Sequence, residues 1–566
     1  MKKEKFYEVT PITSIRDMVC KSTETFADRT VCLRKLKKGE PYTGVKFKQL
    51  KADIWALGTA FLDMGLGDKR IAVIGENRYE WVVSYMAVAC GNMMIVPIDR
   101  ELAAPDIINL LKISKVSAVV YSPKIKAKLE TVKAEVPDVE FMIAMDDSHS
   151  EADYVVKDLI DKGNSLISGG DNRYDNIEID VEAPKIMLFT SGTTAMSKGV
   201  LLCHRNIVTN LMAMCQMVEI TSDDVFLSVL PPHHTYECTC GIMVPIYRGG
   251  CIAFNDGLKY IPNNLAESKA TIMLGVPAIF ELIYKRIWAM ARQKGMEGKL
   301  KAGLKISKAL LKIGIDKRRS IFKSVHETFG GNLRIFISGA AAIDPLVSKG
   351  FRDLGIMFLQ GYGITECSPI ITLNRDINFR DDSAGIALNC LEVKIHEPND
   401  EGVGEIICKG GNVMLGYYEN DEETAKVLKD GWFYTGDLGY MDKDGFVYIS
   451  GRKKNIIIAK NGKNVYPEEL ETFINKSDYV AECMVYEDNS GDDVEICVQV
   501  FPNMSEIELK LGKDATDEQI QELIQSVVDE VNKRSPVWKY IRKVYIRKEE
   551  FEKTTTKKIK RYQVHK

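Results

Sequence analysis

The sequence lacks the compositional extremes that mark non-globular proteins. Its 566 residues contain 76 Lys and Arg against 79 Asp and Glu, so neither sign of charge dominates and the formal net charge is −3. This near-neutrality argues against a general nucleic-acid coat, although it can hide local patches. Hydrophobic residues make up 45% and charged residues 27%, which excludes disordered, collagen-like and disulfide-scaffold chains. At about 150 residues per domain, the length predicts roughly three or four structural units.

The pattern of a secreted protein is also missing. The first residues, MKKEKFYEVT, contain no apolar segment of the kind that a signal peptide needs. The 13 cysteines are odd in number and scattered along the chain. Together these features favour reduced thiols in a cytoplasmic protein.

One uncharged stretch could be mistaken for a membrane span. Residues 81–98 carry no charge over 18 positions, which is near the lower limit for a spanning helix. The dipeptide Gly91-Asn92 interrupts the stretch in its middle. We therefore expect a helix to about Cys90, a turn, and a short strand over 93–96.

Short apolar runs alternate with amphipathic stretches up to about residue 380. The runs are RIAVI at 70–74, AVVY at 118–121, EFMIA at 140–144, KIMLFT at 185–190, TIML at 271–274 and LRIFI at 333–337. Several are almost wholly apolar, as is typical of parallel strands covered on both faces. No period of about 20–50 residues repeats, which argues against a solenoid. The pattern predicts an α/β fold with doubly wound sheets.

The character of the sequence changes at about residue 383. From there to 451 the strands are short and rich in turns, such as DKDG at 442–445, which predicts a β-rich subdomain. Beyond 451, a helix start at Tyr466-Pro467 and a helix over 517–531 predict a small α/β domain. We therefore expect a large domain over 1–451 and a small C-terminal domain over 452–566.

A loop rich in hydroxyl groups follows the apolar run 185–190. It offers backbone N–H groups, hydroxyls and an ammonium group, which together suit phosphate oxygens. Its candidate binding residues are Thr190, Ser191, Gly192, Thr193, Thr194 and Lys198. The Walker pattern is absent from this loop. The residues alone leave a polar surface turn as an equal alternative.

A second cluster is QGYGITE over 360–366. Gly361 and Gly363 allow close approach of a ligand, Tyr362 supplies an aromatic face for a base, and Glu366 could hold Mg²⁺. A tight turn with a solvated glutamate is the alternative. Upstream, the small residues Gly339 and Ala340 follow the run 333–337, where a flat ring could lie against the backbone.

Two further clusters lie nearer the C terminus. In YTGDLG over 434–439, the carboxylate of Asp437 could chelate two ribose hydroxyls, and Arg452 could bind phosphate in a forked geometry. The basic run KTTTKKIKR over 553–561 is by default a solvated tail. Neither cluster is strong evidence alone.

In this order and at this spacing, the clusters resemble the adenylate-forming superfamily, which includes acyl-CoA synthetases, adenylation domains of peptide synthetases and luciferases. Residues 190–199 resemble the signature T-S-G-T-T-G-x-P-K-G, with Ala195 and Ser197 in place of the usual Gly and Pro. Residues 361–366 resemble G-Y-G-x-T-E. The resemblance implies a catalytic role for Thr193. It places Tyr362 against adenine, Thr365 near phosphate and Glu366 on Mg²⁺. Asp437 matches the ribose-binding aspartate of the family, and Arg452 matches the arginine that follows it in the sequence.

The resemblance also implies a two-step reaction with a domain rotation. A carboxylate attacks the α-phosphate of ATP to give acyl-AMP and pyrophosphate, and the thiol of coenzyme A then attacks the acyl-AMP. Lys558 matches the catalytic lysine of the terminal motif, although Lys557 stands where Gly is usual. Lys454 occupies the hinge position, and the region of Gly462 is expected to face the thiol tunnel after rotation. The small domain is therefore expected to be mobile.

The acid substrate is suggested by two further stretches. LPPHHTYE over 230–237 resembles L-P-x-x-H-x-x-E of medium- and long-chain fatty acyl-CoA synthetases, and GVPAIFELIY over 275–284 resembles their helix start. The apolar side chains of Val276, Ile279 and Phe280 suit either a wall for an alkyl chain or core packing. By the same resemblance His234 is a catalytic candidate that orients near the carboxylate or gates the tunnel, against a purely structural histidine.

The leading interpretation is an AMP-forming long-chain fatty acid–CoA ligase that uses ATP, Mg²⁺ and coenzyme A. The nearest alternatives are an acyl-acyl-carrier-protein synthetase or a fatty acyl-AMP ligase, which share the first step. An aryl- or bile-acid-type CoA ligase is a further enzyme reading. A different class is a non-catalytic lipid-binding homologue, which has no need of the adenylation residues.

The segment 292–323 is strongly basic. It contains eleven Lys and Arg against Glu297 and Asp316, a surplus of nine positive charges. Ile306, Leu310 and Ile313 follow an i, i+4, i+7 spacing, with two more apolar residues, Leu311 and Ile315, beside them. A basic amphipathic helix suits an anionic membrane surface, so we expect peripheral contact at the inner membrane face. A helix packed on the large domain with a solvated basic face is the alternative.

Overall fold

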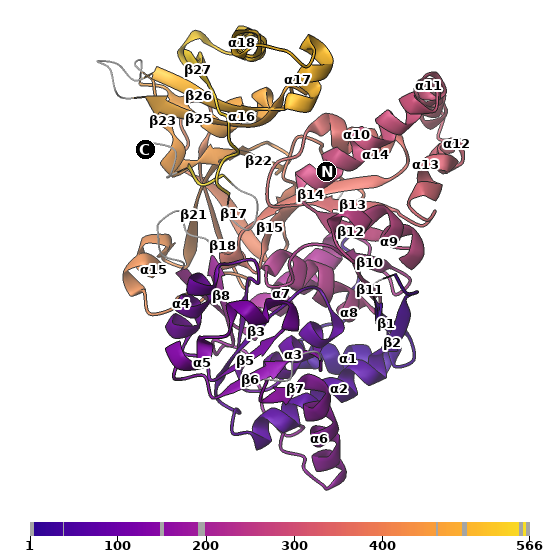
Figure 1. Ribbon diagram of the computed structural model, residues 1–566, viewed down its shortest axis with the longest axis vertical. Helices are drawn as coiled ribbons and strands as arrows, with labels where there is room; N and C mark the ends of the chain where they lie inside the picture. The colour runs from indigo at the N-terminus through magenta and orange to yellow at the C-terminus, as the bar shows by residue number, and fades with distance from the viewer. Residues whose placement is uncertain are drawn as a thin grey trace. The chain divides into compact units, whose positions relative to one another are not determined.

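The computed structural model describes residues 5–37, 39–147, 152–190, 198–459, 462–488, 495–553 and 559–561. These residues form two compact units, which Figure 1 traces in chain order. Unit 1 runs to Glu392 and includes Cys408–Phe433, and unit 2 comprises Val393–Ile407 and the chain from Tyr434 onward. The domain boundary at 451/452 stays a prediction, because strands of the β-rich stretch belong to both units.

The first large sheet of unit 1 has nine strands in the order β16-β15-β14-β13-β12-β10-β11-β1-β2. Their bounds in that order are Ile386–Ala387, Ile370–Leu373, Met357–Gly363, Ile335–Ser338, Ile272–Gly275, Val225–Ser228, Cys251–Phe254, Thr30–Arg34 and Thr43–Lys46. The strands from β14 to β1 pair in parallel, and β15, β16 and β2 extend the two edges antiparallel.

The second large sheet has eight strands in the order β19-β9-β8-β4-β3-β5-β6-β7. Their bounds are Gly416–Tyr417, Lys198–Leu202, Ile186–Thr190, Met94–Ile98, Arg70–Ile74, Ala118–Tyr121, Phe141–Ala144 and Tyr154–Val155. The strands from β8 to β7 are parallel, whereas β9 and β19 add an antiparallel edge. The predicted hydroxyl-rich loop lies in the sequence between the neighbouring strands β8 and β9.

Helices cover these sheets and close the cores of unit 1. The α-helices are α1 Ile15–Phe26, α2 Phe47–Asp63, α3 Tyr79–Ala89, α4 Ala104–Ser114, α5 Val132–Glu135, α6 Val156–Ser168, α7 His204–Met217, α8 Val244–Arg248, α9 Ile261–Ser268, α10 Pro277–Gln293, α11 Glu297–Lys312, α12 Arg318–Ile321, α13 Lys323–Thr328, α14 Pro345–Asp353 and α15 Asp421–Val427. Short helical turns are η1 Pro123–Lys128, η2 Tyr236–Met243, η3 Leu258–Tyr260 and η4 Thr365–Cys367. The apolar side of α4, with Ile107 and Leu111, packs into the core of the second sheet.

The β-rich stretch forms a five-stranded sheet in the order β17-β18-β21-β20, with β22 beside β21. The bounds are β17 Leu391–His396, β18 Gly404–Gly410, β20 Leu428–Lys429, β21 Trp432–Met441 and β22 Val447–Arg452. The C-terminal part of unit 2 contains β23 Ile457–Ile458, β24 Asn464–Val465, β25 Val480–Asp488, β26 Glu495–Pro502, β27 Lys543–Ile546, η5 Lys453–Asn455, η6 Val537–Lys539, α16 Pro467–Ile474, α17 Met504–Leu511 and α18 Asp517–Lys533. Its core joins these strands to α18 through Ile520, Ile524 and Val528.

The predicted α/β fold class is confirmed, and so are the individual apolar runs. Each of the six became a parallel strand, β3, β5, β6, β8, β12 or β13, within two residues of the expected bounds. The uncharged stretch 81–98 forms α3, a turn and β4, as expected. In the described part of the chain, no helix is both long and apolar enough to cross a membrane. All 13 cysteines are free thiols.

Candidate functional site

The predicted hydroxyl-rich loop lies in the sequence between β8 and β9, two antiparallel neighbours in the second sheet. Thr190 at the end of β8 lies opposite Lys198 at the start of β9. Lys198 forms an ion pair with Glu423, and its Nζ lies 5.0 Å from the ring centroid of Tyr417. Ser191, Gly192, Thr193 and Thr194 lie outside the described residues, so their predicted roles stay predictions.

Tyr417 connects this hairpin to the predicted magnesium ligand. It lies in β19, opposite Val200 of β9, and its hydroxyl donates a hydrogen bond of 2.9 Å to Oε1 of Glu366. Burial, and then the charge of Glu366, raises the pKa of Tyr417 well above its ordinary value. The phenol therefore remains a donor at neutral pH. The structure thus brings together Lys198, Tyr417 and Glu366, which are far apart in sequence.

The turn that carries Glu366 is held by two buried asparagines. Asn210 from α7 and Asn412 each donate through the side-chain amide to the carbonyls of Cys367 and Ile370, at 2.8 to 3.3 Å. The carbonyl of Glu366 itself accepts from the backbone N–H of Met414 at 2.8 Å. These bonds hold the η4 turn against the body of unit 1, because buried carbonyls are costly to leave unpaired.

The glycines of 361–363 lie where the backbone approaches other backbone closely. A Cβ on Gly363 would stand 1.9 Å from the carbonyl oxygen of Pro369, and one on Gly361 would stand 2.9 Å from that of Thr372. Only glycine fits such contacts without a shift. Tyr362 and Thr365 are half-buried beside them. The pairing of β14 with β15 by itself explains why these two positions are glycines. The role of the motif toward a nucleotide stays a prediction.

The stretch 230–237 packs against the carboxyl end of β13. The hydroxyl of Tyr236 donates to the carbonyl of Ile337 at 3.0 Å, and its ring fills the space that a Cβ on Gly339 would need. Ala340 adopts a left-handed φ of 71°, which turns the chain away from the strand end. The structure thus places the predicted residues Gly339 and Ala340 directly beside the motif that was expected to contact the acid substrate.

Glu237 and His233 of this motif are buried, and His234 is half-buried. Ser228 donates a hydrogen bond to Glu237, yet burial dominates and raises the pKa of Glu237 to about 8. Burial, then the neighbouring His234 and Arg100, lowers the pKa of His233 well below its ordinary value. The ring centroids of His233 and His234 are 4.0 Å apart. His234, the predicted catalytic histidine, therefore lies in a tightly packed group.

The predicted ribose and phosphate residues pair with each other in unit 2. Asp437 on β21 lies opposite Arg452 on β22, and Arg452 Nε is 2.7 Å from Asp437 Oδ1. Asp437 is buried, whereas the side chain of Arg452 is 42% exposed. The preceding Gly436 has a φ of 70° and donates its N–H to Glu405. The carboxylate of Asp437 and the guanidinium of Arg452 therefore form one ion pair.

The predicted hinge lies at the start of the C-terminal part of unit 2. Lys454 is in η5, and burial, then the charges of Arg452 and Arg561, lowers its pKa. Gly462 has a φ of 74° and closes a turn by donating to Ala459. Lys558 lies outside the described residues, so its role stays a prediction.

Comparison with known families decides the affiliation of the chain. The family described as AMP-binding enzyme matches residues 21–418, and the one described as AMP-binding enzyme C-terminal domain matches 454–566. The chain belongs to the AMP-binding enzyme family. The predicted resemblance to the adenylate-forming superfamily is thereby confirmed.

Curated relatives and solved structures agree with this family. Long-chain-fatty-acid--CoA ligase 5 of Rattus norvegicus is 29% identical over 489 residues, which cover 81% of this chain and 71% of the relative. The ATP-bound crystal structure of MatB from Rhodopseudomonas palustris aligns with a TM-score of 0.75 at 22% identity, over 97% of this chain and 98% of MatB. The anthranilate CoA ligase AuaEII in complex with anthranoyl-AMP aligns with a TM-score of 0.77 at 17% identity, over 99% and 97%. These structures confirm the fold alone.

Some residues of this AMP-binding enzyme that matter to the site were missed by sequence reasoning. Tyr417, Glu423, Asn210 and Asn412 orient the predicted ligands, but none carries a signal in the local sequence, because each acts through tertiary contacts. Phe280, considered as a possible wall for an alkyl chain, is instead fully buried among the rings of Phe336 and Phe358. For this residue the core-packing alternative is correct.

Proposed function

We propose that this AMP-binding enzyme is an AMP-forming fatty acid–CoA ligase that acts on long-chain acids. The observation that carries the proposal is the bridge from Lys198 through Tyr417 to Glu366. This bridge connects the end of the predicted phosphate-binding loop with the predicted Mg²⁺ ligand. A protein that only binds lipid has no need of such a connection. The long-chain assignment is supported by the name of the rat relative and by the 230–237 motif.

The residues around Glu366 fit a magnesium ion. Its carboxylate is half-buried, one oxygen accepts a hydrogen bond from Tyr417, and no described Lys or Arg forms an ion pair with it. A hard cation that prefers oxygen ligands can therefore take the remaining carboxylate capacity. When bound there with ATP, Mg²⁺ would stabilise the negative charge of the departing pyrophosphate.

In the first step, a carboxylate oxygen of the fatty acid attacks the α-phosphorus of ATP. A new P–O bond forms, the bond to the β-phosphate breaks, and acyl-AMP and pyrophosphate result. We propose that Lys198 and the loop hydroxyls bind the phosphates and that Tyr362 stacks on adenine. Asp437 binds the ribose hydroxyls, and Lys558 supplies the positive charge that lets two anions approach.

In the second step, the thiol of coenzyme A attacks the acyl carbon. The thiol loses its proton, the C–S bond forms, and AMP leaves with the pair of electrons from the broken C–O bond. We propose that the C-terminal part of unit 2, which follows Lys454, turns about this residue between the steps, so that the Gly462 turn serves thioester formation. No cysteine of the chain acts as a nucleophile in this scheme.

An ATP–pyrophosphate exchange assay over acids from acetate to stearate tests the adenylation step. Exchange that rises with chain length toward the long acids is the expected result. Exchange that favours benzoate or a bile acid would reassign the substrate class. No exchange with any acid, in a folded protein that binds ATP, would contradict the proposal.

The acceptor is tested separately by product analysis. With ATP, palmitate and either coenzyme A or phosphopantetheinyl carrier protein, we expect acyl-CoA and release of AMP. If the preferred product is the acylated carrier protein, or if acyl-AMP accumulates in the presence of both thiols, one of the alternatives that share the first step is favoured.

We further propose that the basic segment 292–323 contacts anionic membrane. Helix α11 ends at Lys312, earlier than the apolar spacing suggested, and it packs through Gly303 and Ser307 rather than through Ile306. Ile306 is 55% and Ile313 is 68% exposed. Exposed apolar side chains beside exposed lysines are typical of interfacial segments, whereas a packed structural helix would bury them.

Arg318 and Arg319 should be left out of a charge test. Arg318 donates to the carbonyl of Arg352 at 2.6 Å, and Arg319 donates to that of Leu333 at 3.0 Å. These two charges therefore stabilise the fold. Lys299, Lys305 and Lys312 are exposed and form no ion pair among the described residues, which makes them the better probes.

A triple change of Lys299, Lys305 and Lys312 to Gln should weaken binding to vesicles that contain phosphatidylglycerol. At about 1 kcal/mol per lysine, the loss is roughly 150-fold at low salt and shrinks as salt rises. The matched control changes three other exposed lysines, Lys69, Lys157 and Lys510, to Gln. Equal losses in both variants would contradict a role for this segment.

A further inference from the structure

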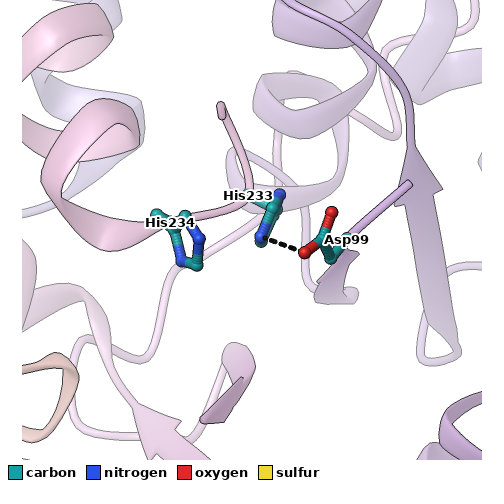
Figure 2. Close-up of side chains that lie close together, drawn as sticks. All are labelled: Asp99, His233 and His234. Carbon is teal, nitrogen blue, oxygen red and sulfur yellow. Dashed lines mark ion pairs between the residues drawn. The ribbon is translucent and has the colours of Figure 1, made fainter. Parts of the chain in front are cut away.

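Three possible metal ligands converge at the 230–237 motif, and two of them belong to it. Asp99 directly follows β4, and His233 and His234 lie in the turn that precedes η2. One ligand-type atom from each residue lies within 4.8 Å of the other two. Figure 2 shows the three side chains close together, with His233 between His234 and Asp99. All three belong to unit 1.

Two of the polar atoms in this group are buried without a hydrogen-bond partner. The side chain of Asp99 is 8% exposed and that of His233 is 9% exposed. Oδ1 of Asp99 accepts from the backbone of Glu101, but Oδ2 of Asp99 and Nε2 of His233 accept or donate no hydrogen bond in the described structure. Buried polar atoms are rarely left unsatisfied, and a bound ion is one of the few explanations.

The spacing of these atoms suits coordination better than hydrogen bonding. His233 Nε2 and Asp99 Oδ2 are 3.5 Å apart, at the long limit for a hydrogen bond. Ligand atoms about 2.0–2.2 Å from a tetrahedral Zn²⁺ stand roughly 3.3–3.6 Å from each other. The measured separation lies in this range.

The surrounding charges also tolerate a cation. Arg100, the basic residue next to Asp99, is balanced by Glu76 at 3.5 Å and Glu101 at 2.9 Å. A second group of three possible ligands in the described residues, Asp488, Glu495 and Cys497, is already neutralised by Lys543, which lies 2.6 Å from Glu495. The Asp99 group is therefore the stronger candidate of the two.

We propose that Asp99, His233 and His234 form a binding site for a divalent transition-metal ion of the Zn²⁺ type. Two imidazoles and one carboxylate suit Zn²⁺ and Co²⁺, whereas Mg²⁺ prefers oxygen ligands. The site is thus chemically distinct from the Mg²⁺ site proposed at Glu366. Three protein ligands leave a fourth position for water or for an oxygen of another molecule.

Cobalt substitution tests the site without any enzyme assay. Co²⁺ added to chelator-treated, full-length protein should bind with one ion per chain and give the visible absorption of a tetrahedral complex. Asp99→Asn and His233→Ala should each lower the Co²⁺ affinity by at least tenfold, and His396→Ala, which changes a histidine of unit 2, should not. Thermal unfolding without metal shows whether each variant is folded.

A second variant guards against loss of folding as the explanation. His233→Cys replaces one metal ligand by another and should keep Co²⁺ bound, with a new sulfur-to-cobalt charge-transfer band. Sulfur bands in the unchanged protein would assign the metal to its native cysteines and overturn the proposal. Binding that is unaffected by both Asp99→Asn and His233→Ala would also overturn it.

A consequence for activity rests on the proposed function. His234 is expected to serve the acid substrate, so a metal that holds it should inhibit adenylation reversibly. Zn²⁺ should lower pyrophosphate exchange in the presence of excess Mg²⁺, a chelator should restore it, and His233→Ala should be at least tenfold less sensitive. Inhibition equal in this variant would contradict the site. Absence of all exchange would count against the function alone, because the cobalt spectrum does not depend on it.

Discussion

In unit 1, Glu366 stands on a turn whose carbonyls accept hydrogen bonds from the buried amides of Asn210 and Asn412. In unit 2, the segment 451–455 is held by charged side chains instead. Arg452 pairs with Asp437 at 2.7 Å, and Lys453 pairs with Glu405 at 2.7 Å, although the two basic side chains are 42% and 59% exposed. Buried neutral hydrogen bonds hold one geometry, whereas ion pairs with a solvent-exposed basic side chain are held less tightly and exchange more easily.

This difference matches two separate demands of the proposed reaction. Phosphate and magnesium must be positioned within a fraction of an ångström, so the residues around Glu366 need a rigid base. A hinge must change its backbone angles between two steps, so the contacts around Lys454 must be cheap to break. In the proposed reaction, we therefore assign the positioning around Glu366 to unit 1 and the movement to the part of unit 2 that follows Lys454.

The largest effect is expected from a change that locks the movable side. Lys454→Pro restricts φ to about −65° and also limits Lys453, so one of the two orientations should be blocked. We expect pyrophosphate exchange to continue while thioester formation from acyl-AMP falls by roughly 1,000-fold. Single-turnover assays of each half-reaction measure the two separately.

The matched control for this change is Lys454→Ala. It removes the same side chain but leaves φ and ψ free, so a backbone hinge predicts only a small loss. Equal impairment of both half-reactions by proline, in a protein that remains folded, would place the hinge elsewhere. Normal rates for both would contradict the rotation.

The fold was predictable because its signals are local. A strand such as β3 is apolar at nearly every position and was found within its true bounds, since parallel strands covered on both faces need no partner information. The turn at Gly91-Asn92 likewise separated α3 from β4. Local pattern and tertiary structure agree in these elements.

The site was only partly predictable because its supports are non-local. The motif was enough to predict Glu366. Tyr417, whose phenol donates a hydrogen bond to it, lies 51 positions away in a two-residue strand without a sequence pattern of its own. Helix α11 shows the same limit. Its spacing left open whether Ile306 faces a membrane or packs on the large domain, and in the structure Ile306 is exposed whereas the small residues Gly303 and Ser307 are buried.

The next prediction concerns unit 1 and the effect of the buried carboxyl of Glu237 on stability. Its pKa is raised to about 8 by burial, whereas an unfolded glutamate titrates near 4.5. The folded state thus keeps a proton that the unfolded state loses, so this group costs stability as pH rises from about 4.5 to 8. Glu237→Gln should remove that dependence and gain roughly 3 kcal/mol over the wild type between pH 5 and pH 8.5.

Urea unfolding of both proteins at the two pH values measures this difference. At pH 5 the cost of the buried carboxyl should be only about 1 kcal/mol, because the folded protein keeps the proton and pH 5 lies just above the pKa of an unfolded glutamate. Parallel pH profiles would show that Glu237 is already ionised in the folded state. The prediction concerns stability, so the readout is independent of activity.

A smaller effect is expected at the magnesium ligand. Glu366→Gln keeps the shape of the side chain and its acceptor for Tyr417 but removes the charge that a hard cation prefers. We expect pyrophosphate exchange at limiting Mg²⁺ to fall by roughly 30-fold, with partial recovery at high Mg²⁺. Exchange at the wild-type rate and with the same Mg²⁺ dependence would remove Glu366 from the site.

The smallest effect is expected at Tyr417, and it separates positioning from charge. Tyr417→Phe deletes only the hydroxyl that donates to Glu366 at 2.9 Å and keeps the ring beside Lys198. A hydrogen bond to a charged group is worth about 1.5–3 kcal/mol, but water can replace a donor at a half-buried carboxylate, so we expect a loss near 1 kcal/mol, or about fivefold in exchange. If the phenol orients Glu366, the loss should be smaller in the Glu366→Gln background, where the acceptor carries no charge, so the two changes should add less than fully. Tyr440→Phe, which removes a phenol of the β21 strand in unit 2, serves as the control.

Full additivity of Tyr417→Phe and Glu366→Gln would show that the bridge between the two clusters does not act in the reaction. The rigid side of the molecule would then rest on the asparagine contacts alone.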